Sequence, residues 1–334
     1  MHAYYRQPAI YKDQVVFIAE DDLWTFNLKD KVARRLTANL GMIRYPQFSP
    51  DGKQIAFTST EEGTSEIYIM SSEGGEAKRL TYLGAYLYTL GWKGSKVIFA
   101  SSHSSIFQGF YKLYEIDSEG GAPVELPYGR ARDISFGEKG VVLGRNTVNP
   151  SSWKRYRGGT AGYILIDKNG DGKFKKLIDL KGNFACPMWI GNRIYFICDH
   201  EGIGNIYSCT PEGKDLQKHS NHKDYYARGA YSDGKSIIWH SGAELWLMEI
   251  KENKPRKLSF AYSSPMVQRQ HKFVSPPQNL ENVYLSPDGG SLSLELRGKA
   301  LVSGNWEGSV QQYGWHQGVR YRLPQILPDG KHLL

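Results

Sequence analysis

The residues with the clearest chemical potential lie in one short segment in which basic and aromatic side chains alternate. Residues 153–159 read WKRYRGG, and the side chains are those of Trp153, Lys154, Arg155, Tyr156 and Arg157. Guanidinium groups bind carboxylates through paired hydrogen bonds and stack on aromatic rings, so these five residues are candidates for contact with a peptide. The alternative, which we favour, is that they brace a long insertion against a neighbouring part of the fold or a neighbouring subunit.

Two motifs resemble metal sites but lack the full set of ligands. Residues 167–172, DKNGDG, match the start of an EF-hand loop, but Ile178 stands where that loop needs a bidentate Glu, so we interpret them as a hairpin turn. His219 and His222 have H-x-x-H spacing without a third ligand nearby, and we interpret them as surface histidines. The sequence therefore predicts neither a metal nor another cofactor.

Nucleophilic catalysis is not predicted for this chain. It contains no G-x-S-x-G motif, and no Ser, His and acidic residues that the strand order would bring together. Its three cysteines, Cys186, Cys198 and Cys209, have no C-x-x-C spacing, so we expect them to be buried or half-buried in a protein of a reducing compartment. We therefore predict no catalytic residue.

Charge and hydropathy argue against nucleic-acid and membrane partners. The formal net charge is +8, but the basic residues are scattered in twos and threes and form no continuous stripe. The first residues, MHAYYRQPAIYKDQ, contain no apolar core of a signal peptide, and no stretch approaches the roughly 18 apolar residues of a membrane span. We expect a soluble, cytoplasmic protein.

These candidate residues are embedded in a sixfold repeat. Each copy has a polar residue, an aliphatic, an anchor that is usually aromatic, a turn, and a second strand often ending in Leu-Thr or Leu-Ser. The shortest step between anchors is 39 residues (207 to 246) and the longest is 51 (114 to 165). These steps are typical of β-propeller blades. The anchors are Trp24, Tyr68, Tyr114, Leu165, Tyr207 and Trp246.

A second recurrent hairpin precedes most copies, as in FSPDGKQIAFTS from Phe48, where Asp-Gly separates two apolar strands. Two hairpins per repeat make a four-stranded blade. Segments such as VVFIA from Val15 are apolar on both faces, so each sheet must be covered by neighbours on both sides. The sequence thus predicts an all-β fold, a six-bladed β-propeller of four-stranded antiparallel blades.

The repeat also predicts the domain boundaries. Residues 1–260 are expected to form the propeller, and residues 261–280, rich in Ser, Pro and Gln, to form a linker. The blade pattern returns in 281–334, which we interpret as the incomplete start of a second propeller. A sheet that stopped at Leu334 would leave unpaired edges, so we expect the natural polypeptide to continue.

Several longer stretches carry a family resemblance. They are GRNTVNPSSWKRYRGGTAGYILID from Gly144, DDLWTFNLKDKVARRLTANLG from Asp21, the stretch that begins GNRIYFICDHEGIGNIYSC at Gly191, and FVSPPQNL in the expected linker. Here the chain resembles the amino-terminal region of the tricorn protease family, whose propeller repeats are similar to those of TolB. The resemblance implies a six-bladed and a seven-bladed propeller, a PDZ-like module and a serine peptidase core, assembled into a homohexamer.

By this resemblance the chain is the channel, gating and scaffold portion of a self-compartmentalising peptidase, with peptides and other domains and subunits as partners. Family members hold a substrate carboxyl end with a basic pair, but TYLGAYLYTLGW from Thr81 contains no Arg or Lys, so that role does not transfer. Two alternatives remain. One is a free-standing TolB-like scaffold, and the other is the propeller of a prolyl-oligopeptidase-like hydrolase, which requires a later α/β-hydrolase domain with G-x-S-x-G.

We expect no peptide hydrolysis by the purified 334-residue chain, even at high protein concentration, because no catalytic residue is predicted within it. Release of amines from peptide substrates is the measurement. Turnover that disappears when one of the chain's own serines is replaced would overturn this prediction.

Overall fold

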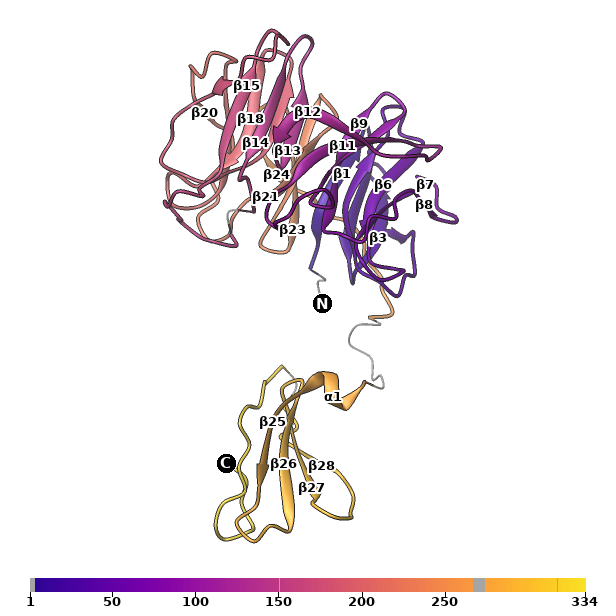
Figure 1. Cartoon of the computed structure of the whole chain (residues 1–334), viewed down its shortest axis with the longest axis vertical. Helices are drawn as coiled ribbons and strands as arrows, with labels where there is room; N and C mark the ends of the chain where they lie inside the picture. Colours follow the sequence, from indigo (N-terminus) through magenta and orange to yellow (C-terminus); the bar gives the residue numbers. More distant parts are fainter. Residues whose placement is uncertain (1–3, 150, 267–273, 317) are drawn as a thin grey trace. The chain divides into compact units, whose positions relative to one another are not determined.

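The computed structural model describes residues 4–149, 151–266, 274–316 and 318–334. They belong to two compact units, Met1–Val267 and Gln268–Leu334. Across these described ranges the strands form seven four-stranded antiparallel sheets, six in the first unit and one in the second (Figure 1). None of the helices in the described part of the chain has the length and apolarity needed to cross a membrane.

The first three blades are each built from four consecutive strands. Blade 1 contains β1 (Arg6–Tyr11), β2 (Gln14–Ala19), β3 (Asp22–Asn27) and β4 (Arg34–Arg35). Blade 2 contains β5 (Ile43–Phe48), β6 (Gln54–Ser59), β7 (Glu66–Ser71) and β8 (Lys78–Arg79). Blade 3 contains β9 (Leu87–Lys93), β10 (Lys96–Ser101), β11 (Lys112–Asp117) and β12 (Val124–Arg130).

The next three blades follow the same plan. Blade 4 contains β13 (Asp133–Phe136), β14 (Val141–Arg145), β15 (Tyr163–Asp167) and β16 (Lys175–Lys176). Blade 5 contains β17 (Phe184–Ile190), β18 (Arg193–Cys198), β19 (Asn205–Cys209) and β20 (Gln217–Lys218). Blade 6 contains β21 (Arg228–Ser232), β22 (Ser236–Ser241), β23 (Glu244–Glu249) and β24 (Arg256–Lys257).

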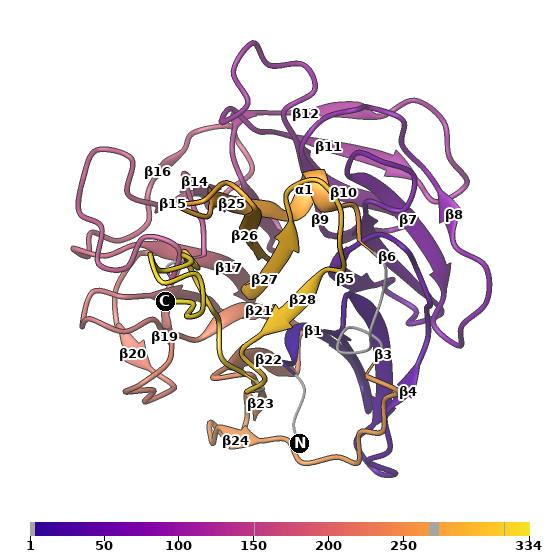
Figure 2. The same ribbon diagram turned by 90° about the horizontal axis from the view of Figure 1, so that it is seen from below.

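The predicted repeat anchors all lie in the third strand of a blade, and each faces the same position of the second strand. Leu165, the non-aromatic anchor, pairs with Leu143 just as Tyr68 pairs with Phe57. The first strand of each blade lies innermost and the fourth outermost (Figure 2). The fold predicted from the repeat is therefore confirmed. The other pairs are Phe17 with Trp24, Phe99 with Tyr114, Phe196 with Tyr207 and Trp239 with Trp246.

The recurrent Leu-Thr ending is explained by a hydrogen-bonded cap. In blade 1 the Thr37 hydroxyl donates to Asp22 Oδ1 at 2.7 Å and accepts from the Leu23 backbone N–H at 3.0 Å. The buried acidic residue at the start of the third strand thus finds a donor, which a buried carboxylate requires. Equivalent bonds join Thr81 to Glu66 at 2.5 Å and Ser220 to Asn205 at 2.8 Å.

Blades 1 and 6 close the ring without exchanging a strand. Every described sheet uses strands consecutive in sequence, and β1 packs beside β21 and β22. The Tyr5 backbone N–H donates to the Ala243 carbonyl at 3.2 Å, and that of Lys12 donates to Asp233 Oδ2 at 3.1 Å. Because no ladder joins the two sheets, closure depends mainly on side-chain packing.

The segment after blade 6, residues 258–264, crosses blade 1 and is here called the clasp. The Ala33 backbone N–H donates to the Ala261 carbonyl at 2.8 Å. Phe260 stacks on Phe26 with ring centroids 4.3 Å apart, and the Tyr262 hydroxyl donates to Glu20 at 3.1 Å. Aromatic contacts of this kind add to the free energy of burial, so the clasp fastens the end of the ring to its beginning.

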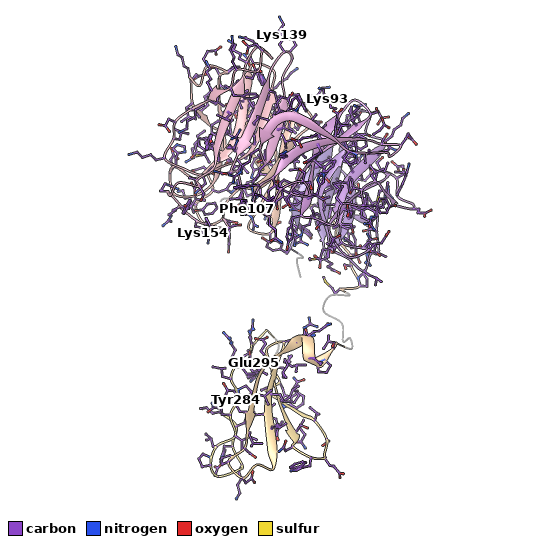
Figure 3. The ribbon with its side chains drawn as sticks, viewed as in Figure 1. Lys93, Phe107, Lys139, Lys154, Tyr284 and Glu295 are labelled. Atoms are coloured by element: carbon purple, nitrogen blue, oxygen red, sulfur yellow. The ribbon has the colours of Figure 1, made fainter. Side chains whose placement is uncertain are left out.

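The second unit is a single blade with few buried apolar side chains. Among its described residues Ala300 and Pro324 are the only buried apolar side chains, and Trp306 and Trp315 are 89% and 77% exposed. Buried Glu295 accepts hydrogen bonds from the Leu323 backbone and from Asn282 (Figure 3). Its elements are α1 (Pro276–Asn279), β25 (Leu280–Leu285), β26 (Ser291–Leu296), β27 (Lys299–Gly304) and β28 (Gln311–Tyr313).

The predicted linker, 261–280, has a mixed structure where it is described. Residues 261–264 belong to the clasp, and residues 267–273 lie outside the described residues. Residues 265–266 and 274–275 lie outside helices and strands, α1 occupies Pro276–Asn279, and β25 begins at Leu280. That the single blade begins a seven-bladed propeller stays a prediction.

We expect Phe260→Ala to lower the free energy of unfolding of the propeller by about 2 kcal/mol, because it removes a partly buried ring from the blade 1 and blade 6 contact. Urea unfolding followed by circular dichroism measures the effect. The matched control, Phe107→Ala, removes a 58% exposed ring from a loop and should change stability by well under half as much. Equal losses would show that the clasp does not stabilise closure.

Candidate functional site: the axial cavities and their basic mouth

The inner strands of the propeller line two cavities near its centre, of about 250 Å³ and 570 Å³. Among the described residues, six line both cavities, and each belongs to a different blade. We call them the neck. The neck residues are Gln7, Tyr45, Tyr88, Asp133, Cys186 and Gly229.

Four neck residues lie at equivalent β-bulges in the innermost strands of their blades. Gln7, Tyr45, Cys186 and Gly229 have φ values of 47°, 53°, 49° and 55°, in the left-handed region that non-glycine residues seldom adopt. Each lies where the pairing of the first and second strands shifts register, as in a β-bulge. Gly229 adopts this conformation without steric cost, whereas Gln7, Tyr45 and Cys186 are strained. Bulges redirect side chains and concentrate at functional sites, so these bulges mark the axis as the candidate site.

The larger cavity is strongly basic. Its lining contains four arginines from four blades, all at or next to the start of the innermost strand, and one described acidic residue, Asp133. We call this cavity the basic mouth. The smaller cavity has no basic side chain in its described lining, which includes Leu90, Met188 and Trp189. The arginines are Arg6, Arg44, Arg132 and Arg228.

The arginines differ in their partners. Arg6 forms an ion pair with Asp21. The other three form no ion pair within the described residues: Arg132 lies over the Tyr111 ring at 4.4 Å, Arg228 donates to the Tyr4 hydroxyl at 3.0 Å, and Arg44 is exposed. Three of the four guanidinium groups at the basic mouth therefore have no ion-pair partner among the described side chains.

Burial shifts the titration of the groups around the neck. Burial raises the pKa of Asp133 to about 6, even though Thr147 and the Arg132 charge act to lower it. Burial and the charges of Arg228 and Arg6 lower the pKa of His240 to about 3, and its Nδ1 accepts the Gln7 backbone N–H at 3.2 Å. Burial raises the pKa of Cys186 to about 12. Near neutral pH His240 and Cys186 are thus uncharged.

The two faces of the propeller differ in surface chemistry. In antiparallel blades the loops between the second and third strands, and those that join one blade to the next, lie at the end where the innermost strand begins. This mouth face bears Phe107 and Lys154, whereas Lys93 and Lys139 lie on the opposite face (Figure 3). Its loops carry most of the exposed large apolar side chains of the propeller, among them Leu40, Met42, Tyr82, Tyr86, Ile106, Phe107, Phe110, Trp153 and Tyr225.

The predicted peptide-contact residues lie in the β14–β15 loop on this face. Arg157 forms an ion pair with buried Asp199 at 3.2 Å, and the Arg155 backbone N–H donates to the same carboxylate at 3.2 Å. These bonds brace the loop against blade 5. Trp153, by contrast, is 63% exposed and packs against Tyr156 at 5.1 Å.

Among the described residues, Lys154 is the one predicted peptide-contact residue that lines a cavity. It lines a separate cavity together with Arg228, and its ammonium group lies 6.0 Å from the Tyr226 ring centre. Contact between a peptide and any of the five residues stays a prediction.

The interpretation of His219 and His222 as surface histidines was wrong. His219 is buried, and its ring nitrogens lie 2.7 Å from Ser208 Oγ and 2.6 Å from Asn253 Oδ1. Half-buried His222 accepts a hydrogen bond from the indole N–H of Trp239 at 2.9 Å. Burial lowers the pKa of both histidines. The polar loop sequence does not reveal that the blade-to-blade contact encloses them.

The structure also locates the DKNGDG segment and the three cysteines. The DKNGDG segment begins at Asp167, the last residue of β15, and its backbone N–H groups, including those of Gly170 and Gly172 at 2.8 Å, donate to the Asp167 carboxylate. These bonds lower the pKa of Asp167 although burial opposes them. Cys186 is half-buried, and Cys198 and Cys209 are buried, as expected.

Sequence reasoning missed the basic mouth. A signal was present, because Arg6-Gln7-Pro8 and Arg44-Tyr45-Pro46 share an Arg-x-Pro pattern at the start of equivalent strands. Blade 3 has Tyr88 at the equivalent position, which pairs with Ala100. These arginines lie at the start of the first strand, outside the recurrent segments that define the repeat.

The sheets, their closure and the axial cavities define a six-bladed β-propeller. Residues 2–254 match the family described as the tricorn protease N-terminal β-propeller domain. The chain belongs to the tricorn protease family. It is 34% identical to a tricorn protease homolog of Saccharolobus solfataricus, over 99% of this chain and 31% of that protein. It is 34% identical to the tricorn protease of Thermoplasma acidophilum, over 88% of this chain and 28% of that protein.

The fold agrees with a crystal structure of the tricorn protease, with a TM-score of 0.84 and 31% identity over 98% of this chain and 33% of that one. The chain thus spans about a third of the length of these relatives. In Sulfurisphaera tokodaii two separate proteins match parts of the chain. They are a putative tricorn-like protease N-terminal subunit, 31% identical over 50% of this chain, and a C-terminal subunit, 38% identical over 47%.

We expect Asp133→Asn to raise the free energy of unfolding of the propeller more at pH 8 than at pH 4.5. The difference between the two gains should be about 2 kcal/mol. The pKa of Asp133 is raised to about 6 in the folded chain and lies near 4 in an unfolded one, so its ionised form opposes folding above pH 6. In the wild-type chain this penalty disappears as the pH falls from 6 to 4. Urea unfolding at both pH values measures the difference.

Asp51→Asn is the control for this effect. Hydrogen bonds from Ser49 and from the Lys53 backbone lower the pKa of Asp51, so its replacement should bring no gain at pH 8. A pH-independent effect of Asp133→Asn would show that its carboxyl has an ordinary pKa.

Proposed function

We propose that the six-bladed unit is the peptide channel, gate and scaffold of a tricorn-type, self-compartmentalising serine peptidase. In this proposal the 334 residues carry no catalytic group, peptides pass along the axis, and the chemistry belongs to other parts of the assembly. The single observation that supports it best is the neck, where each blade contributes one residue to the wall of both axial cavities.

The proposed partners are peptides and other domains or subunits of a cytoplasmic homohexamer. Family membership supports this part of the proposal, as does the division of the Sulfurisphaera relatives into two subunits. The apolar side chains on the mouth face, such as Phe107 and Trp153, offer a surface to such partners, because exposed apolar patches commonly mark protein contacts.

The alternative of a free-standing TolB-like scaffold has weaker support. A TolB structure from Acinetobacter baumannii matches with a TM-score of 0.50 and 18% identity, which indicates a shared fold only. A peptide channel and a protein scaffold can both be built on a six-bladed propeller, so the fold does not distinguish them. They differ in where a peptide binds, which is along the axis for a channel and on the loops for a scaffold.

Photo-crosslinking separates the two functions. We expect an uncharged hexapeptide that contains benzoylphenylalanine to crosslink to inner strands, especially near Met188, which lines the smaller axial cavity. Excess unlabelled peptide should compete, and mass spectrometry locates the crosslinks.

Two nearly volume-conserving variants serve as a matched pair. Met188→Leu should lower the crosslink yield, whereas Met42→Leu, on an exposed loop, should leave it unchanged. Crosslinks confined to loops, or none at all, would contradict an axial peptide path.

A further inference from the structure

The basic mouth concentrates positive charge in a confined space. Arg44, Arg132 and Arg228 form no ion pair within the described ranges, and Arg228 Nε is buried with no hydrogen-bond partner there. Four blades supply the guanidinium groups of one 570 Å³ cavity. Like charges gathered at a concave, low-dielectric wall attract anions more strongly than the same charges scattered over a surface.

Few negative groups offset this charge. Asp133 is the one acidic side chain in the described lining of the basic mouth, and Asp21 is already paired with Arg6. The neighbouring His240 and Cys186 are uncharged near neutral pH. The basic mouth therefore keeps a net positive charge, and a ligand that brings carboxylates would complete its ion pairs.

The adjoining cavity indicates what carries those carboxylates. Beyond the neck the wall contains Leu90, Met188 and Trp189, with no basic group among its described residues. Guanidinium groups next to a mostly apolar cavity suit a peptide with both acidic and apolar side chains. A small inorganic anion would use only the first of these two environments.

We propose that the basic mouth selects peptides with Asp or Glu side chains, which pair with Arg44, Arg132 and Arg228 as the peptide enters the axis. This inference rests on the proposed peptide-channel function and adds a substrate preference to it. It concerns side-chain carboxylates, which occur anywhere along a peptide, and requires no free carboxyl terminus.

The test uses the complete chain and three octapeptides that bear one neutral dye, an acetylated amino terminus and an amidated carboxyl terminus. They differ at three positions, which hold Glu, Gln or Lys. By fluorescence anisotropy at low salt, we expect the Glu peptide to bind about tenfold or more tightly than the Gln peptide, and this advantage to shrink as salt is added.

Single substitutions test whether the preference for the Glu peptide arises at the basic mouth. Arg44→Gln, Arg132→Gln and Arg228→Gln should each weaken binding of the Glu peptide by about threefold, the range expected for one partly exposed ion pair, and leave the Gln peptide unchanged. Arg44 is exposed, so its variant is expected to fold even if another does not. The matched control Lys139→Gln removes the same charge from the opposite face and should change neither affinity (Figure 3).

The outcomes distinguish this inference from the proposed function. Equal affinity for Glu and Gln peptides, or an equal loss with Lys139→Gln, overturns the acidic preference and leaves the channel proposal in place. Absence of binding by all three peptides overturns both. Displacement of the Glu peptide by inorganic phosphate, at an ionic strength where chloride has no effect, would identify a phosphate site and also overturn the acidic-peptide preference.

Discussion

The need of each sheet to cover two apolar faces determines the rest of this structure. Strands such as β2 and β18 are buried almost throughout, and the apolar clusters lie between neighbouring blades. A sheet of this kind gains most of its stability from its neighbours, so six of them form a ring that has no free end. The second unit shows the contrast, because its one described sheet buries little apolar surface.

The ring geometry places its chemistry at the axis. Packing fixes the second and third strands, while the first strands must converge, and four of them do so through a residue in the left-handed region. The strain at the three of these residues that are not glycine, Gln7, Tyr45 and Cys186, is offset by the surrounding sheets. The convergence of the first strands brings polar and charged side chains, among them Asp133 and Arg228, around two small cavities. A single blade would expose these side chains to solvent.

The two faces have different chemistry for a related reason. The short turns within hairpins are polar, as their Asp-Gly and Lys-Gly sequences require, and they lie together at one end of the ring. The longer loops lie at the other end, where the β14–β15 loop is fastened to blade 5 through Asp199. A basic cavity encircled by exposed apolar side chains follows from this arrangement, and it gives the mouth face the features of a binding surface.

The sequence by itself determined the all-β class, the six blades and their register, because the anchors from Trp24 to Trp246 recur with the period of a local unit, and local periodicity is visible along the chain. It also located the β14–β15 loop as a candidate site. Only the tertiary structure decided that Arg6, Arg44, Arg132 and Arg228 share one cavity and that His219 is enclosed. These outcomes depend on contacts between residues far apart in sequence, which arise when the sheets pack around a common axis.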